Sequence, residues 1–280
     1  MRISAAMRQA QGETWPALAR RTAGLGFRGV SLAFDPQWRD EDLIAIRQAF
    51  DGHGVQIVEL ACPCNVLTRS ADEARGNVAF LSRALDAGAL LNCDHAVTFA
   101  GSRHPDPRQP LAPHPDNWLD ATWDLLVQRV WALLESVEDL GVRLCFEPCP
   151  TTTLNTLDAL SELMADLASV RVRVALDPAA IFSAAAAAQP AYAVAEVFSS
   201  LGDTIGIARA TDVRLIEAGE EPHAEPAPLG EGVLDYEVYL RLVAALELDT
   251  PIIVKPQGSD AAYRSAHAFL ANAAKRAGVQ

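Results

Sequence analysis

Two stretches of the sequence, Val142-Arg143-Leu144-Cys145-Phe146-Glu147-Pro148 and Val172-Arg173-Val174-Ala175-Leu176-Asp177-Pro178, decide the fold class. Each is a short run of mainly apolar and β-branched residues that ends in a carboxylate followed by proline, which is typical of a buried β-strand. Between them, Thr156–Leu167 has apolar residues at helical spacing. Strand, helix and strand in this order predict a β/α repeat with parallel strands, because parallel neighbours need a crossover connection that is usually a helix.

The same alternation extends along the chain in both directions from this unit. Strands are predicted at Ile3–Met7, Gly29–Ala33, Val55–Leu60, Cys93–Phe99, Val142–Phe146, Val172–Leu176, Ile205–Ala210 and Ile252–Val254. Helices are predicted at Glu13–Leu25, from Asp40 to Gly54, and at Asp72–Leu85, Asn117–Leu140, Thr156–Leu167, Tyr192–Leu201, Tyr236–Leu246 and Ala261–Ala277.

Eight strand–helix units in 280 residues average about 35 residues each, which fits a closed (β/α)₈ barrel. A doubly wound open sheet typically has fewer units, and the first predicted strand is not followed by GxGxxG. We therefore predict an α/β fold, a single (β/α)₈ TIM barrel, with residues 1–280 in one domain.

Composition and charge narrow the possible partners. The formal net charge is −13, and no Lys/Arg-rich run offers a surface for nucleic acid. No apolar run is long enough for a membrane span, and the N-terminus has no secretory signal pattern, so we expect a cytoplasmic protein with a small-molecule substrate. The five cysteines are an odd number in strand-like surroundings, which favours reduced thiols over disulfides. A homo-oligomer stays open.

Charged residues stand where four successive predicted strands end. Glu147 follows the fifth strand, Asp177 the sixth, Arg209 lies near the end of the seventh, and Lys255-Pro256 follows the eighth. Because the active sites of such barrels are built from strand C-termini, these residues are the candidate catalytic group. Ionisable groups that converge there must pair or bind an ion. The alternative is a set of solvated salt bridges on the rim.

Further candidates come from other predicted strands and loops. His95 is assigned to the exit of the fourth strand and His104 to the loop that follows it, and both are candidate substrate contacts or structural histidines. Glu59, from the third strand, and Asp212, just after the seventh, complete the candidate substrate-binding residues on strands.

Three motifs in the order Val142–Pro148, Val174–Pro178 and Pro228-Leu229-Gly230-Glu231-Gly232 resemble the xylose isomerase-like superfamily of sugar isomerases and epimerases. The resemblance spans nearly the whole chain. It implies a sugar-metabolic enzyme in which a divalent metal orients the sugar oxygens and stabilises an enediolate while carboxylates move the proton. It also implies that the loop carrying Glu231 helps to cover the substrate, although a plain turn explains this loop almost as well.

The family holds its metal with Glu after strand five, Asp after strand six, His on strand seven and Glu at strand eight. Glu147 and Asp177 match the first two ligands, but Arg209 and Lys255 stand at the other two positions. Neither cation can donate a lone pair to a metal, so the resemblance implies a degenerate metal site and no cofactor. If the alignment of the last two strands differs, Glu147 and Asp177 are the ligands for Mn, Mg, Zn or Co.

We therefore expect an isomerase- or epimerase-like enzyme for a small polyhydroxylated or carboxylate-bearing carbonyl compound. Glu147, Asp177, Arg209 and Lys255 sum to zero charge; the cations would bind a carboxylate or oxyanion, and a carboxylate would be the general base. The alternatives are a lyase that forms a Schiff base on Lys255, with a protonated structural lysine favoured over it, and an inactive barrel that serves in binding or assembly. The superfamily's DNA-repair branch is disfavoured because this acidic chain lacks its His-rich metal set.

Overall fold

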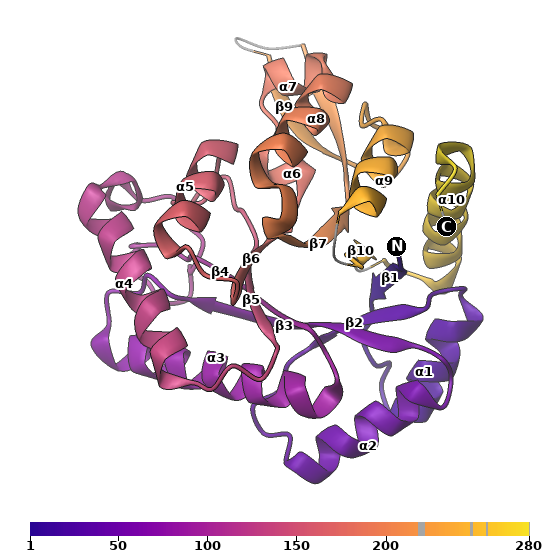
Figure 1. Cartoon of the computed structure of the whole chain (residues 1–280), viewed down its shortest axis with the longest axis horizontal. Helices are drawn as coiled ribbons and strands as arrows, with labels where there is room; N and C mark the ends of the chain where they lie inside the picture. The colour runs from indigo at the N-terminus through magenta and orange to yellow at the C-terminus, as the bar shows by residue number, and fades with distance from the viewer. Residues whose placement is uncertain (218–221, 247–248, 256, 280) are drawn as a thin grey trace.

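The computed structural model describes residues 1–217, 222–246, 249–255 and 257–279. Eight parallel strands close into a barrel in the order β1-β10-β7-β6-β5-β4-β3-β2, and helices surround it (Figure 1). The barrel strands are β1 (Ile3–Ala6), β2 (Gly29–Ala33), β3 (Gln56–Asn65), β4 (His95–Phe99), β5 (Arg143–Phe146), β6 (Val172–Leu176), β7 (Ile205–Ala210) and β10 (Ile252–Val254). The predicted (β/α)₈ barrel is confirmed.

The ring closes where the first strand meets the last. Within β1, Ser4 is in register with Gly29 of β2 and with Ile253 of β10, so one strand bridges the two ends of the sheet. Closure leaves no open sheet edge in the barrel.

Helices cover the outside of the barrel, and several begin at the residue types that favour a helix start. Ser70, Thr156 and Ser259 each accept a backbone N–H of the first turn that follows. The helices are α1 (Trp15–Gly24), α2 (Asp40–Asp51), α3 (Ala71–Leu91), α4 (Asp120–Ser136), α5 (Leu157–Leu167), α6 (Pro178–Ile181), α7 (Ala184–Ala188), α8 (Pro190–Leu201), α9 (Tyr236–Ala245) and α10 (Asp260–Ala277), with short 3₁₀ turns at η1 (Pro115–Trp118) and η2 (Gly202–Thr204).

The largest differences from the predicted boundaries are in three elements, β3, α3 and α4. β3 continues to Asn65, since after an irregularity it pairs again with Phe99 of β4. α3 runs to Leu91 and ends at the left-handed residue Asn92. α4 is shorter than predicted at both ends, because η1 precedes it and Arg171 binds the carbonyls of Leu134 and Val137 (2.6 and 3.0 Å) where the helix stops.

An antiparallel hairpin that the sequence pattern did not predict follows the seventh barrel strand. It consists of β8 (Asp212–Ile216) and β9 (His223–Ala227), with Val213 opposite Pro226. β8 contacts α6 and α7, which places the hairpin beside the C-terminal ends of β6 and β7. The hairpin therefore adds a wall to one side of the barrel mouth.

Pro256, the second residue of the Lys255-Pro256 pair, lies outside the described residues. All five cysteines are free thiols in the structure. No helix in the described part of the chain is long and apolar enough to cross a membrane. The assignment of all of residues 1–280 to one domain stays a prediction.

Candidate active site at the barrel mouth

The four predicted catalytic residues converge because of strand alternation. Cys145, Ala175, Ile207 and Ile253 belong to the small apolar cluster inside the barrel, together with Val58 and Val97. Side chains that are two residues apart on a strand point to the same face. Two residues after each of these four come Glu147, Asp177, Arg209 and Lys255. The alternation therefore directs these four charged side chains into the mouth of the barrel.

Glu59 reaches the same place by a different route. The pairing of β2 with β3 passes from Val30 opposite Ile57 to Ser31 opposite Glu59, so Val58 is an extra residue on β3. Such a bulge re-aims the side chains around it. Val58 belongs to the interior cluster, and its neighbour Glu59 also reaches the charged residues of the mouth.

Arg209 connects two buried carboxylates. Its Nη1 donates to Oε2 of Glu59 at 2.5 Å, and its Nε donates to Oε2 of Glu147 at 2.8 Å. Its Nη2 donates to both carboxylates as well. Because the guanidinium is planar and presents a fork of donors, it can bridge two carboxylates on opposite edges.

Lys255 extends this network toward solvent. Its Nζ lies 2.5 Å from Oδ2 of Asp177 and 3.1 Å from Oε1 of Glu147. Thr211 donates its hydroxyl to the other oxygen of Asp177 at 2.5 Å, and the backbone N–H of Ala179 donates to that same oxygen at 3.1 Å. We call Glu59, Glu147, Asp177, Arg209 and Lys255 the mouth network.

Glu59 changes the charge expected for this site. The four residues singled out at the strand ends sum to zero, but Glu59 is also bound to Arg209, so three carboxylates and two cations give a net charge of −1. Glu59 is 1% exposed, and its other contact is the hydroxyl of Ser31 at 2.9 Å. It is therefore a buried partner of Arg209, and its predicted role as a substrate contact does not fit this position.

The two cations differ in what they can reach. The side chain of Arg209 is 6% exposed, whereas that of Lys255 is 40% exposed. Burial opposes the charge of Arg209, but Glu59 and Glu147 outweigh it and raise the pKa of the guanidinium. Burial likewise opposes the charge of Lys255, while Asp177 and Glu147 raise the pKa of its amine above the ordinary value. Both stay protonated, and Lys255 is the one of the two that can meet a substrate.

A pocket of about 320 Å³ opens above the network. Glu147, Asp177 and Lys255 contribute to its floor, and Thr211 and Cys149 also line it. This size is at the lower end of the range for small-molecule sites. The remaining lining residues are Phe99, Pro148, Pro150, Ala179, Ala180 and Pro226.

The donor set of the mouth does not fit a divalent metal ion. Each of the six carboxylate oxygens of Glu59, Glu147 and Asp177 already accepts a hydrogen bond from a cation, a hydroxyl or a backbone N–H. Arg209 and Lys255 have no lone pair to offer in their protonated forms. Among the described residues, no group of three or more His, Cys, Asp and Glu side chains is arranged to hold a metal.

The predicted position of His95 is wrong. His95 is the first residue of β4 and is in register with Arg143, the first residue of β5, so it lies at the opposite end of the barrel from Glu147. Its Nδ1 is 3.1 Å from the carbonyl of Val58, and burial lowers the pKa of the imidazole. Strand β4 begins at His95 instead of ending there. His95 is therefore a structural histidine at the N-terminal end of the barrel.

His104 lies in the loop after β4, as predicted, but the contacts it makes are local. Its Nδ1 accepts the backbone N–H of Asp106 at 3.2 Å, and its ring packs edge-on against His114 with centroids 6.1 Å apart. It is not among the residues that line the mouth pocket. Its role as a substrate contact stays a prediction.

Asp212 organises a loop. Its carboxylate accepts the backbone N–H groups of Gly230, Gly232 and Leu234 at 3.0 to 3.1 Å, and that of Val213 at 2.8 Å. Because both oxygens are engaged and the residue is 1% exposed, Asp212 holds the 228–234 loop in place. Glu231, in this loop, is exposed and does not line the mouth pocket, so covering of a substrate by this loop stays a prediction.

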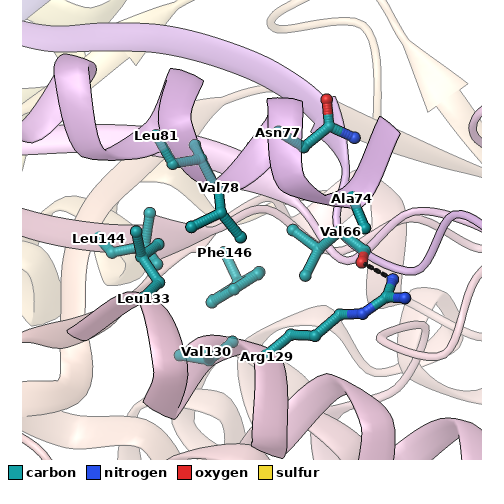
Figure 2. Close-up of a pocket in the computed structure, with 10 residues that line it drawn as sticks. All are labelled: Val66, Ala74, Asn77, Val78, Leu81, Arg129, Val130, Leu133, Leu144 and Phe146. Atoms are coloured by element: carbon teal, nitrogen blue, oxygen red, sulfur yellow. Dashed lines mark hydrogen bonds between the residues drawn. The ribbon is translucent and has the colours of Figure 1, made fainter. Parts of the chain in front are cut away.

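A second cavity, between α3, α4 and β5, is a packing gap. It has a volume of about 10 Å³, which is room for one water molecule. Figure 2 shows that apolar side chains such as Val78, Leu133 and Phe146 surround it, while Arg129 turns its guanidinium to the carbonyl of Val66. It therefore offers no place for a substrate.

Comparisons with known proteins agree with this architecture. A family model described as "Xylose isomerase-like TIM barrel" matches residues 19–273. No curated protein matches the chain. Three similar solved structures are a probable 3-DHS dehydratase from Bacillus anthracis (15% identity, 97% of this chain and 99% of that chain, TM-score 0.74), a 3-keto-D-glucoside 4-epimerase from E. coli (15%, 97% and 100%, 0.73) and a xylose isomerase-like TIM barrel protein from Mycobacterium smegmatis in complex with magnesium (16%, 99% and 97%, 0.72). At these identities the likeness shows the fold.

Proposed function

Since the chain belongs to the family of xylose isomerase-like TIM barrels, we propose that it is an isomerase- or epimerase-like enzyme that moves a proton at a carbon next to a carbonyl group. One of the similar structures is an epimerase, which is consistent with this chemistry. The observation that carries the proposal is the position of Lys255, a half-exposed ammonium on the floor of the mouth pocket between two carboxylates.

Lys255 is suited to hold the oxygen of a reacting carbonyl. An ammonium group has three N–H donors, and the contacts with Asp177 and Glu147 use two of them. The third donor is available to an oxygen in the pocket. When a neighbouring C–H is deprotonated, negative charge develops on that oxygen, and a fixed cation beside it stabilises the transition state.

Glu147 is the preferred general base. Its Oε1 contacts Lys255 at 3.1 Å, which is longer than the 2.5 Å contact of Lys255 with Asp177. A small turn of the ammonium toward the substrate oxygen would free Oε1 to take the proton from carbon. The protonated Glu147 would then return the proton to the neighbouring carbon for isomerisation. For epimerisation a proton must reach the same carbon from the opposite face, and Asp177 would deliver it after taking one from water, while Glu147 loses its proton to solvent.

In this proposal the reaction runs without the divalent metal implied by the family resemblance. Lys255 supplies the positive charge at the substrate oxygen, and Arg209 fixes Glu147 through the contact of its Nε with Oε2 at 2.8 Å. Metal analysis of protein purified without a chelator tests this point. Stoichiometric, tightly bound Mn, Mg, Zn or Co would contradict it.

Hydrogen exchange tests the proton transfer itself. Wild-type protein in D₂O should exchange the hydrogen next to the carbonyl of a responsive α-hydroxycarbonyl compound, followed by NMR. Glu147→Gln should slow this exchange by about 10²- to 10⁴-fold, the usual contribution of a general base. Glu162→Gln, an exposed carboxylate on α5, is the matched control and should leave the rate unchanged. Equal rates for wild type and Glu147→Gln would contradict the assignment.

One observation favours the alternative that the barrel is inactive and serves in binding or assembly. Every carboxylate oxygen of the mouth network is already hydrogen-bonded, as expected for a network that only stabilises the fold. Under this alternative, no carbonyl compound would undergo exchange. A rate above the buffer background that depends on Glu147 would exclude it.

The Schiff-base alternative is less well supported. A lysine must lose its proton to attack a carbonyl, but Asp177 and Glu147 outweigh the effect of burial and raise the pKa of Lys255. We therefore expect borohydride to trap no adduct on Lys255 in the presence of ketoacids. A stable adduct on this residue, identified by mass spectrometry, would reinstate the lyase.

A further inference from the structure

The walls of the mouth pocket are mostly apolar. Above the charged floor stand the rings of three prolines, one aromatic ring and two methyl groups, and these come from four separate segments of the chain. The residues are Phe99, Pro148, Pro150, Ala179, Ala180 and Pro226. Hydroxyl groups of a ligand that face such walls lose their water partners and gain none in return. A body rich in hydroxyls is therefore a poor match, and an alkyl body is a good one.

The charge of the floor disfavours an anionic ligand. Lys255 would attract a carboxylate, but Asp177 and Glu147 lie 2.5 and 3.1 Å from the same ammonium and would repel it. Arg209 adds attraction and Glu59 adds repulsion from further away, so the network as a whole is −1. A monoanion that binds Lys255 thus enters a site whose carboxylates already outnumber its cations.

A cationic ligand is disfavoured by the same hydrogen bonds, because they already occupy the carboxylate oxygens that would attract it. The oxygens of Glu147 and Asp177 are occupied by donors, and the charged group that reaches solvent is the ammonium of Lys255. The floor therefore offers an N–H donor and calls for a neutral acceptor, such as a carbonyl or hydroxyl oxygen.

We infer that the mouth pocket takes an uncharged α-hydroxycarbonyl compound with a largely alkyl body, its oxygens on Lys255 and its body against the proline and alanine walls. This inference rests on the proposed function for the reacting group. It differs from both substrate classes expected from the sequence, because the structure adds Glu59 to the network and apolar walls to the pocket.

Cys149 provides a reporter of binding that is independent of activity. It lines the pocket, is partly exposed, and its Sγ lies 3.3 Å from the hydroxyl of Thr151. The other partly exposed thiol is Cys64, and burial raises its pKa to about 11. Because the thiolate is the reacting form, Cys64 should react slowly with iodoacetamide near pH 8, and mass spectrometry distinguishes its adduct from that of Cys149. A ligand in the pocket should slow the alkylation of Cys149, and Cys149→Ser should remove the adduct that mass spectrometry detects there.

The experiment compares three six-carbon compounds as protectants of Cys149: 2-hydroxycyclohexanone, D-fructose and 2-oxohexanoate. The first is uncharged and mostly alkyl, the second is polyhydroxylated, and the third carries a carboxylate. We expect 2-hydroxycyclohexanone to protect at a concentration at least tenfold lower than either of the others. Among linear α-hydroxyketones, each additional buried CH₂ should improve protection by about fourfold. Equal or better protection by D-fructose or 2-oxohexanoate would overturn the inference.

Two variants test whether the apolar wall is the cause. Ala180→Asp places a charge in the wall and replaces no member of the mouth network, so it should weaken protection by 2-hydroxycyclohexanone at least tenfold. Ala191→Asp makes the same change at an exposed position of α8 that does not line the pocket, and it should have no effect. Circular dichroism shows whether both variants fold. Unchanged protection in a folded Ala180→Asp protein would also overturn the inference.

Hydrogen exchange in D₂O separates this inference from the proposed function. If 2-hydroxycyclohexanone protects Cys149 as described but no compound undergoes exchange, the ligand class stands and the proposed enzyme does not. If D-fructose undergoes exchange that depends on Glu147 and 2-hydroxycyclohexanone neither protects nor reacts, the proposed enzyme stands and the ligand class is wrong.

Discussion

Arg209 and Arg173 lie on neighbouring strands, β7 and β6, but at opposite ends of the barrel, and their guanidinium groups have different partners. Arg209 donates hydrogen bonds to two buried carboxylates, which together raise its pKa in spite of its burial. Arg173 has a buried Nε that lacks a hydrogen-bond partner among the described residues, and burial lowers its pKa. At the mouth, the buried charge of Arg209 is balanced by two carboxylates. At the N-terminal end of the barrel, the partly exposed Arg173 forms no salt bridge within the described residues, although Asp203 favours its charge.

The difference between Arg209 and Arg173 shows that the buried charges are connected into one network at the mouth of the barrel. The mouth network joins residues from β3 and from the ends of β5, β6, β7 and β10, and removal of one member leaves others unpaired. In barrels of this kind the C-terminal face carries the chemistry, and the N-terminal face mainly contributes stability. The following predictions test the contrast between the two ends, in order of decreasing expected effect.

Replacement of Arg209 should have the largest effect on stability. Arg209→Met leaves Glu59 and Glu147 buried without their cation, which should lower the free energy of unfolding by roughly 3–5 kcal/mol. Urea denaturation followed by circular dichroism measures this loss. Arg276→Met, which removes an exposed pair with Glu237, is the matched control and should cost no more than about 1 kcal/mol. Similar losses in the two variants would show that the mouth network has no special weight.

Replacement of Lys255 should cost less and should depend on pH. Lys255→Met should lower stability at neutral pH by about 1–2 kcal/mol, a reduced value because the side chain is 40% exposed. The raised pKa of Lys255 means that its contribution is fully present below pH 10.5, the ordinary value, and is lost as pH rises through the folded-state pKa. Unfolding curves of wild type and variant should therefore converge above pH 10.5. A constant difference up to pH 12 would contradict this linkage.

His95, at the N-terminal end of the barrel, should make the free energy of unfolding sensitive to acid. Burial lowers its pKa, while the Val58 carbonyl, Asp94 and Glu59 favour the charged form and Arg143 opposes it. Below pH 6.5 the unfolded chain binds a proton that the native imidazole does not, so stability should fall by at most about 1.4 kcal/mol per pH unit.

His95→Gln should remove this acid-dependent decrease, which thermal unfolding between pH 5 and 7.5 would detect. The same variant should leave hydrogen exchange at the mouth unchanged, because His95 lies at the other end of the barrel. A drop in the exchange rate would restore His95 to the substrate site and would weaken the contrast between the two ends.

Replacement of Arg173 should have the smallest effect. Arg173→Met removes a guanidinium whose Nη1 donates to the neighbouring carbonyl of Val172 at 3.2 Å, so stability should change by no more than about 0.5 kcal/mol in either direction. Urea midpoints compared side by side with Arg209→Met provide the measurement. A loss of stability above about 2 kcal/mol would show that the N-terminal end of the barrel depends on Arg173 as the mouth depends on Arg209.

The fold and four of the five network residues could be predicted from the sequence for one physical reason. Alternating side chains of parallel strands fix both the interior cluster and the residues that follow it, so Glu147, Asp177, Arg209 and Lys255 had to converge once the strands were known. Glu59 was placed on the right strand. Its partnership with Arg209, however, depends on a register shift at Val58 that periodicity does not reveal.

The errors at other positions have equally local causes. His95 was assigned to the wrong end of β4 because a strand of five residues leaves little room to separate its start from its exit. The hairpin β8–β9 was missed because its strands contain Pro226 and several charged residues, which depress strand propensity. The role of Asp212 depends on backbone N–H groups that the folded 228–234 loop brings together, and a sequence pattern does not show them.

The pairing of β1 with β10 also determines when the site can exist during folding. Ile3 and Ile252 are neighbours in the sheet but are separated by most of the chain, so this contact carries the largest loop-closure cost in the barrel. Lys255 follows directly after β10, and its ammonium meets Asp177 and Glu147 at the mouth of the closed ring. A partly folded chain with its last strand undocked would hold Arg209 between its carboxylates and yet lack the lysine. Ring closure and the completion of the mouth network are thus the same event.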